Sequence, residues 1–117
     1  MEEALFRTML FDSYGELLTE KQREYFDLHY NEDLSLAEIA QSEGVSRQSV
    51  WDIIRRAEET MRRLEEKTGR VARCAAERNI LAAAEEKLAT LETMTEGEAH
   101  ALTREIADAL QELRHGI

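Results

Sequence analysis

Proline is absent from the sequence, and only five of the 117 residues are glycine. Aromatic residues make up 6% of the chain, and β-branched residues are few beside the many Ala, Leu, Glu and Arg residues. Strands favour aromatic and β-branched residues, whereas helices favour Ala, Leu, Glu and Arg. The composition therefore predicts an all-α fold.

Cysteine and long apolar runs are also scarce. The single cysteine, Cys74, excludes an intramolecular disulfide. The longest uninterrupted apolar run, Ile80 to Ala84, is far shorter than the roughly 20 residues that cross a bilayer. No charged segment followed by a long apolar run begins the chain, so we expect a cytoplasmic protein without a membrane span.

Positive charge is in deficit, with 15 basic against 25 acidic residues and a net charge of −10. This balance disfavours unaided binding to phosphate backbones or anionic lipids. Residues 1–45 carry a net charge of −8 and residues 74–117 a net charge of −5, but residues 46–73 carry +3. The one basic stretch therefore lies in the middle of the chain.

Capping residues mark the expected helix boundaries. Thr19 with Gln22, and Ser35 with Glu38, have the spacing of a capping box, in which each side chain bonds to the backbone N–H of the other residue. Ser46 is placed to cap a longer helix that begins at the next residue. These signals predict three helix starts.

Residues 35–54 have the spacing of a helix-turn-helix. Its apolar positions and its turn are Leu36, Ile39, Ala40, Gly44, Val45, Val50 and Ile53. Ala40 is small enough for the second helix to pass over it, and Gly44 can adopt the left-handed conformation of the turn. Val45 is expected to fill the corner between the helices. A simple helical corner without a ligand is the alternative.

The outer face of the second of these helices is the candidate binding site. Its expected nucleic-acid-binding or partner-binding residues are Arg47, Gln48, Ser49, Trp51, Asp52, Arg55 and Arg56. In helix-turn-helix proteins this helix enters the major groove, where Arg can read guanine and Gln can read adenine. Asp52 would repel phosphate, so we expect it to pair with Arg55 or Arg56. Trp51 suits a packed aromatic, a shelf for Arg55 or a protein interface, so the face fits either class of partner.

The remainder of the chain predicts a helical hairpin over residues 69–117, after a helix-turn-helix domain over residues 1–68. Its two seams are Cys74, Leu81, Ala84, Leu88 and Leu91, then Ala99, Leu102, Ile106, Ala109 and Leu113. A capping box over residues 95–98 separates them. Such apolar seams must be buried against another surface. That surface is the first domain, the other seam, or a second copy of the chain in a homodimer. Gly69 either ends or bends the preceding helix.

Catalytic and metal-binding constellations are missing from the sequence. His29, His100 and His115 have no cysteine or carboxylate at ligand spacing. No nucleophile elbow or phosphate-binding glycine loop is present. We therefore expect a non-enzymatic protein that needs no cofactor and no metal ion.

Several blocks of the sequence resemble known families. They are Leu18-Thr19-Glu20-Lys21-Gln22-Arg23, Ser35-Leu36-Ala37-Glu38-Ile39-Ala40, Gly44-Val45-Ser46-Arg47-Gln48-Ser49-Val50 and Ile54-Arg55-Arg56-Ala57-Glu58. They resemble region 4 of bacterial sigma factors and, more closely, the YlxM family of small helix-turn-helix proteins, over residues 4–67. Trp51 departs from the usual Tyr of that family. Beyond Gly69 only length and helical character match.

The two resemblances imply different roles. The YlxM family implies an accessory or regulatory role in the signal recognition particle pathway, with the particle's GTPase or its RNA as partner. Sigma region 4 implies a DNA-binding fold. The hypothesis that fits it is a transcriptional regulator that binds duplex DNA as a dimer, with the C-terminal seams pairing two copies. The residues alone support the two roles nearly equally. The closer resemblance to the YlxM family favours the role in the signal recognition particle pathway.

Overall fold

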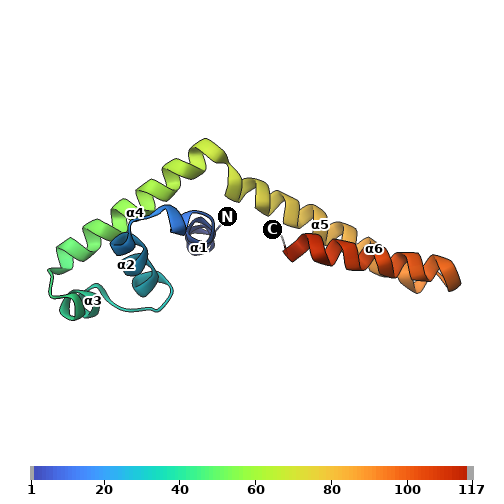
Figure 1. The fold of residues 1–117 in the computed structure, drawn as a ribbon, viewed down its shortest axis with the longest axis horizontal. Helices are drawn as coiled ribbons and strands as arrows, with labels where there is room; N and C mark the ends of the chain where they lie inside the picture. Colours follow the sequence, from blue (N-terminus) through green and yellow to red (C-terminus); the bar gives the residue numbers. More distant parts are fainter. Residues whose placement is uncertain (1, 116–117) are drawn as a thin grey trace. The chain divides into compact units, whose positions relative to one another are not determined.

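The computed structural model describes residues 2–115, and every regular element in that range is a helix (Figure 1). The helices are α1 (Glu3–Tyr14), the short 3-10 helix η1 (Gly15–Leu17), α2 (Glu20–Tyr30), α3 (Leu36–Glu43), α4 (Arg47–Thr68), α5 (Arg70–Thr93) and α6 (Gly97–His115). The predicted all-α fold is confirmed. The chain forms two units that divide between Val71 and Ala72, slightly beyond the boundary expected at residue 68.

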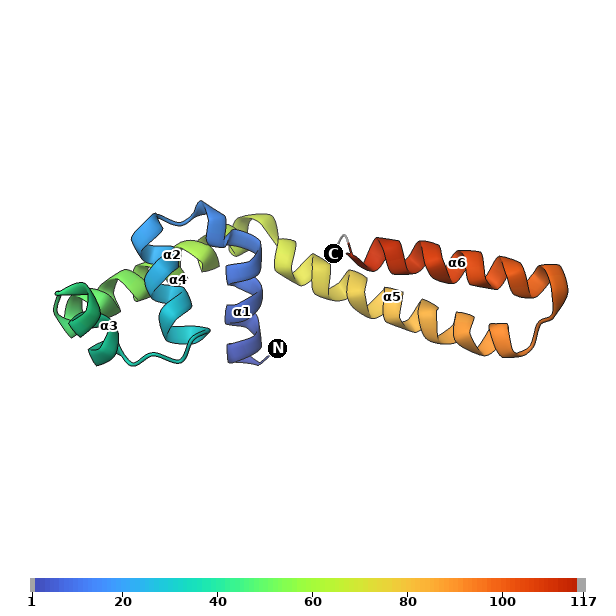
Figure 2. The ribbon, with the colours of Figure 1, turned by 60° about the horizontal axis from the view of Figure 1, so that its bottom comes forward.

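Helix α4 is the central element of the first unit, and α1, α2 and α3 all contact it (Figure 2). Its apolar residues recur at three- and four-residue steps, which places them on one face. The buried core of the unit consists of Leu10, Tyr14, Leu18, Tyr25, Phe26, Ile39, Ala40, Val50, Ile54, Ala57, Met61 and Val71. The face of α4 opposite this core is left for solvent.

The caps predicted for the first unit, at Thr19, Ser35 and Ser46, are all present. The Thr19 hydroxyl accepts the backbone N–H of Gln22 at 3.2 Å, and the Gln22 amide oxygen accepts the N–H of Thr19 at 3.1 Å. Ser35 and Glu38 form the same reciprocal pair ahead of α3. Ser46 accepts the N–H of Ser49 at 3.1 Å and so caps α4. Each cap satisfies backbone donors that a helix start leaves open.

The turn between α3 and α4 is built on Gly44, whose φ of 69° is left-handed as predicted. The backbone N–H groups of Gly44 and Val45 both reach the carbonyl oxygen of Ala40. Ile39 and Ala40 lie buried beneath the second helix. The expectation that Val45 fills the corner is wrong, because this turn leaves its side chain 42% exposed.

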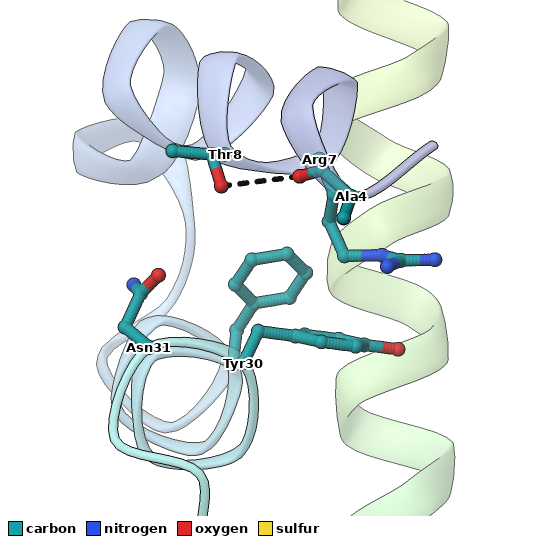
Figure 3. A pocket seen from close by; sticks show the side chains of 6 residues that line it. Ala4, Arg7, Thr8, Tyr30 and Asn31 are labelled. Carbon is teal, nitrogen blue, oxygen red and sulfur yellow. Dashed lines mark hydrogen bonds between the residues drawn. The ribbon is translucent and has the colours of Figure 1, made fainter. Parts of the chain in front are cut away.

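Arg7 and Glu58 join α1 to α4 at the edge of the core. The Arg7 Nε donates to the Glu58 carboxylate at 2.7 Å, and Arg62 donates to its other oxygen at 3.0 Å. Arg7 also lies over the ring of Tyr30, 4.4 Å from its centre. Figure 3 shows Arg7 and Tyr30 pointing together toward α4, beside a pocket of about 90 Å³ between α1 and α2. Three helices therefore share one half-buried charged cluster.

Glu58→Gln is expected to lower the free energy of unfolding at neutral pH by about 1.5 kcal/mol, because two charge-assisted hydrogen bonds become neutral ones. Burial raises the pKa of the Glu58 carboxyl, but the hydrogen bonds and charges of Arg7 and Arg62 outweigh burial and leave the pKa below its usual value. A lowered pKa in the folded state stabilises the fold above the usual pKa of about 4.3, and this contribution is lost as pH falls through the folded value.

Urea unfolding across a pH series measures the difference in free energy of unfolding between the parent chain and Glu58→Gln. This difference should shrink as the pH is lowered. Glu59→Gln is the matched control, because Glu59 is an exposed neighbour that pairs with Arg55 on the surface and should change stability little. An equal effect of both substitutions, or a loss that does not depend on pH, would contradict the assignment.

Gly69 ends α4, and a new helix starts at the next residue. Gly69 has a left-handed φ of 61°, and its N–H donates to the carbonyl oxygen of Glu65 at 2.8 Å. The Glu65 carboxylate accepts the Tyr14 hydroxyl at 2.7 Å and the backbone N–H of Val71 at 2.8 Å. Thr68 shares a short hydrogen bond with the same Tyr14 hydroxyl. Val71, the last residue of the first unit, is thus held in its core.

The second unit is the predicted helical hairpin, with α5 and α6 antiparallel and side by side in both ribbon views (Figures 1 and 2). Ion pairs link the two helices at two levels. Arg114 donates to Glu85 at 2.9 Å through its Nε, and Arg104 donates to Glu92 at 3.1 Å. Leu81 and Thr103 are buried between them.

Two expectations for the hairpin are wrong. All five residues of the predicted α6 seam are exposed, and the inward row is His100, Thr103, Ala107, Leu110 and Arg114. This row places His100 beside Glu92 and Arg114 beside Glu85 of α5. In the α5 seam, Leu81 is buried and Cys74 and Leu88 are half-buried, but Ala84 and Leu91 are exposed.

The capping box expected over residues 95–98 is the second error. The Thr95 hydroxyl donates back to the carbonyl oxygen of Glu92, at 3.3 Å. Helix α6 then starts at Gly97, whose φ is 65°. The left-handed backbone of Gly97 therefore begins α6, where a side-chain cap from Thr95 was expected.

Candidate macromolecule-binding face

The first three turns of α4 present the predicted site residues on the surface. Arg47, Gln48, Ser49, Trp51, Arg55 and Arg56 are exposed, and Asp52 is half-buried. Val50 and Ile54, which alternate with them along the helix, are completely buried. The buried residues fix the rotation of α4 about its axis, so the outer face has a defined set of side chains. We call these seven residues the α4 outer face.

Charge on the α4 outer face is mainly positive. Asp52 accepts a hydrogen bond from the Gln48 amide at 3.1 Å and lies 3.9 Å from the Arg55 guanidinium, which is the pairing expected for it. Arg55 also donates to Glu59 at 2.7 Å. Among the described residues, no carboxylate lies within ion-pair distance of Arg47 or Arg56. Two arginines are therefore available to an incoming anionic group.

Trp51 lies in an open hollow of about 510 Å³ where the starts of α3 and α4 come together. The hollow is lined by Leu36, Ser46, Arg47, Gln48 and Trp51. No arginine lies over the Trp51 ring within the part of the chain that the structure describes, so Trp51 is not a shelf for Arg55. Arg55 is held instead by carboxylates three residues before it and four residues after it.

Leu36 and Ser46 belong to this hollow although the sequence analysis did not select them as binding residues. Ser46 is the N-cap of α4 and Leu36 follows the N-cap of α3, so the sequence marks both as structural residues. Their nearness to Trp51 follows from the turn at Gly44, which folds α3 back on α4. The hollow therefore extends the α4 outer face onto the start of α3.

Across residues 2–115, no three His, Cys, Asp or Glu side chains converge as they would around a metal ion. His29 instead bonds to the carbonyl oxygen of Leu34 at 2.8 Å, and His100 bonds to that of Glu92 at 3.2 Å. No described helix has the length and apolar character that a bilayer crossing requires.

Comparison with known proteins identifies the family. The sequence profile of UPF0122, the helix-turn-helix proteins described as YlxM/p13 like, matches residues 1–102. A UPF0122 protein of Clostridium kluyveri is 62% identical over 56 residues, which are 48% of this chain and 50% of that protein. The chain thus spans about half the length of this relative.

Another relative is similar over most of its length. A UPF0122 protein of Halalkalibacterium halodurans is 40% identical over 104 residues, covering 80% of this chain and 95% of that protein. A third, from Thermoanaerobacter, is 49% identical over 72 residues, which are 62% of each chain. The profile covers both the helix-turn-helix and much of the hairpin. The chain therefore belongs to the YlxM/p13-like family of helix-turn-helix proteins.

Proposed function

We propose that the chain is a non-enzymatic regulatory protein that binds duplex DNA through the α4 outer face. The observation that carries this proposal is the exposure of Arg47, Gln48 and Arg56 on one side of a helix whose other side is anchored in the core. Arginine can donate two hydrogen bonds to guanine, and glutamine can pair with adenine. Arg47, Gln48 and Arg56 lie in the first three turns of α4, and the early turns of this helix are the part that enters the major groove in helix-turn-helix proteins.

DNA is favoured over duplex RNA as the ligand of this face. The major groove of B-form DNA is wide enough to admit an α-helix, whereas that of A-form RNA is deep and narrow. The acidic balance of the whole chain makes single-site binding weak. We propose that the chain compensates by acting as a homodimer joined through its C-terminal helices, with two α4 helices in successive grooves.

Arg47→Ala and Arg56→Ala are each expected to weaken DNA binding by about 1–3 kcal/mol where the side chain contacts a base. A phosphate contact would instead reduce the slope of affinity against salt concentration by about one unit. Fluorescence anisotropy of a labelled mixed-sequence duplex, titrated at several salt concentrations, separates these outcomes. A duplex RNA of the same sequence should bind more weakly.

Arg23→Ala is the control for these variants. Arg23 is exposed on α2 among Glu20, Glu24 and Asp27, so its loss removes the same charge from an acidic surface. Its DNA affinity should match that of the parent chain. Absence of binding by the parent chain at low salt, or equal losses in all three variants, would reject the proposal.

A second candidate is an accessory protein of the signal recognition particle that binds the particle's protein component. It is favoured by the net charge of −8 over residues 1–45, which steers the chain toward basic protein surfaces. An exposed tryptophan beside arginines also suits a protein interface. Titration of the purified GTPase with the chain should then show binding that weakens with salt, and no salt-sensitive binding would remove this candidate.

A further inference from the structure

The hairpin of α5 and α6 has an apolar face that the described residues leave uncovered. Its large side chains, between 47% and 75% exposed, are Ile80, Leu91, Met94, Leu102, Ile106 and Leu113. Exposed alanines at positions 84, 99 and 109 continue the same rows. We call these nine residues the apolar hairpin face.

Helical geometry places both rows on one side of the hairpin. On each helix, every residue of the exposed row directly precedes a residue of the inward-facing row, so the two rows lie about 100° apart and in the same rotational sense. Two antiparallel helices side by side are related by a two-fold axis perpendicular to the plane that contains both. Rotation about this axis exchanges the helices but leaves each face of the hairpin on the same side. The two rows therefore form one layer about 21 Å long.

The hairpin has little core of its own. Between Ala72 and His115, only Leu81 and Thr103 are buried. Ion pairs from Arg104 and Arg114 add to the contact between the helices, but such exposed pairs stabilise only weakly. Two helices that bury so little apolar surface are marginal in water. A further layer on the apolar hairpin face would supply the missing core.

Charges in and beside the apolar hairpin face are complementary to a second copy of the same hairpin. Lys87 stands within the α5 row, between Ala84 and Leu91, and Glu98, Glu105 and Glu112 follow the outer flank of α6 at seven-residue steps. Within the described chain these four side chains have no ion pair. The contacts of Glu85 and Glu92 with α6 set the register and place Lys87 level with the segment from Glu105 to Glu112.

We infer that two copies associate through the apolar hairpin face as a four-helix bundle, in which α5 of each copy packs against α6 of the other. This pairing brings Lys87 of one copy toward Glu105 of the second. Packing α5 on α5 and α6 on α6 would instead oppose like charges. The inference rests on the proposed homodimer and specifies its interface.

Sedimentation equilibrium of the full chain over a dilution series tests the face. The parent chain is expected at twice its mass of 13.5 kDa, and Ile106→Glu at the single-chain mass. Ala101→Glu adds the same charge on the polar side of α6 and should remain a dimer. Circular dichroism checks that each variant keeps its helices. A monomeric parent chain, or a dimeric Ile106→Glu variant, overturns the inference.

A charge exchange tests the pairing of α5 with α6. Lys87→Glu and Glu105→Lys should each weaken the dimer several-fold, and the double variant should recover the parent affinity. Failure of the double variant to recover overturns the arrangement. A monomeric chain that still binds DNA through Arg47 rejects the bundle alone, whereas a dimer that binds no DNA rejects only the DNA-binding role.

Discussion

Phe26→Ala is expected to lower the free energy of unfolding of the first unit by about 3–5 kcal/mol, the usual cost of emptying a buried aromatic site. Phe26 is 1% exposed on α2. Its ring stacks on Phe11 of α1 with centres 5.1 Å apart, and it meets the Tyr30 ring at 4.8 Å. Removing it leaves a cavity between α1, α2 and α4 that the surrounding side chains can close only in part.

Urea unfolding followed by tryptophan fluorescence measures this loss, because the single tryptophan, Trp51, belongs to the first unit. Leu17→Ala is the control. Leu17 is a large apolar residue that is 68% exposed, so its truncation should change stability by no more than about 0.5 kcal/mol. Similar losses in the two variants would contradict the packing described for Phe26.

Ile39→Ala is expected to cost about 2–5 kcal/mol, because Ile39 is completely buried where α3 packs on α4. The effect should be largest in α3, which has only eight residues and depends on this packing more than on its own propensity. Native-state hydrogen exchange should therefore show the α3 amides opening before those of α4. Urea unfolding gives the total loss.

A graded control accompanies this variant. Ile39→Val removes one methyl group and should cost about 0.5–1.5 kcal/mol while leaving the order of exchange unchanged. If α4 lost protection before α3, Ile39 would be supporting α4 and the account of the turn would need revision. The result also bears on the α4 outer face, whose orientation depends on the same crossing.

Elements that depend on neighbouring residues could be predicted from the sequence. Thr19 with Gln22, and Ser35 with Glu38, form the expected capping boxes because each pair acts within a single turn of helix. Gly44 adopts the expected left-handed conformation for the same local reason. The end of α4 at Gly69 is local too, but the immediate restart at Arg70 depends on Glu65 and Tyr14, which no short pattern connects.

The inward row of α6 could not be predicted in this way. Its two candidate rows, one with Leu102 and Ile106 and the other with Thr103 and Leu110, lie about 100° apart on the same helix. The first is the more apolar, so hydrophobic periodicity selects it. In the structure the second row faces α5, where Arg114 pairs with Glu85, and such a contact between distant residues has no signature in a single sequence.

The candidate site was predicted in position but not in detail. Periodicity separates Val50 and Ile54 from the exposed residues of α4, and the pairing of Asp52 with Arg55 follows from their spacing. The hollow beside Trp51 depends on Leu36, which a different helix contributes. Its formation requires the fold of the turn, so the sequence pattern alone does not reveal it.

The position of Val71 determines where a fragment that contains the first unit can end. Val71 is 1% exposed in the core of the first unit, although it stands in the first turn of α5, past the end of α4. A fragment that stopped at Thr68 would lose this side chain, together with the N–H that Glu65 accepts. An expression boundary for the isolated helix-turn-helix unit therefore belongs within α5, where a whole turn beyond Gly69 is retained.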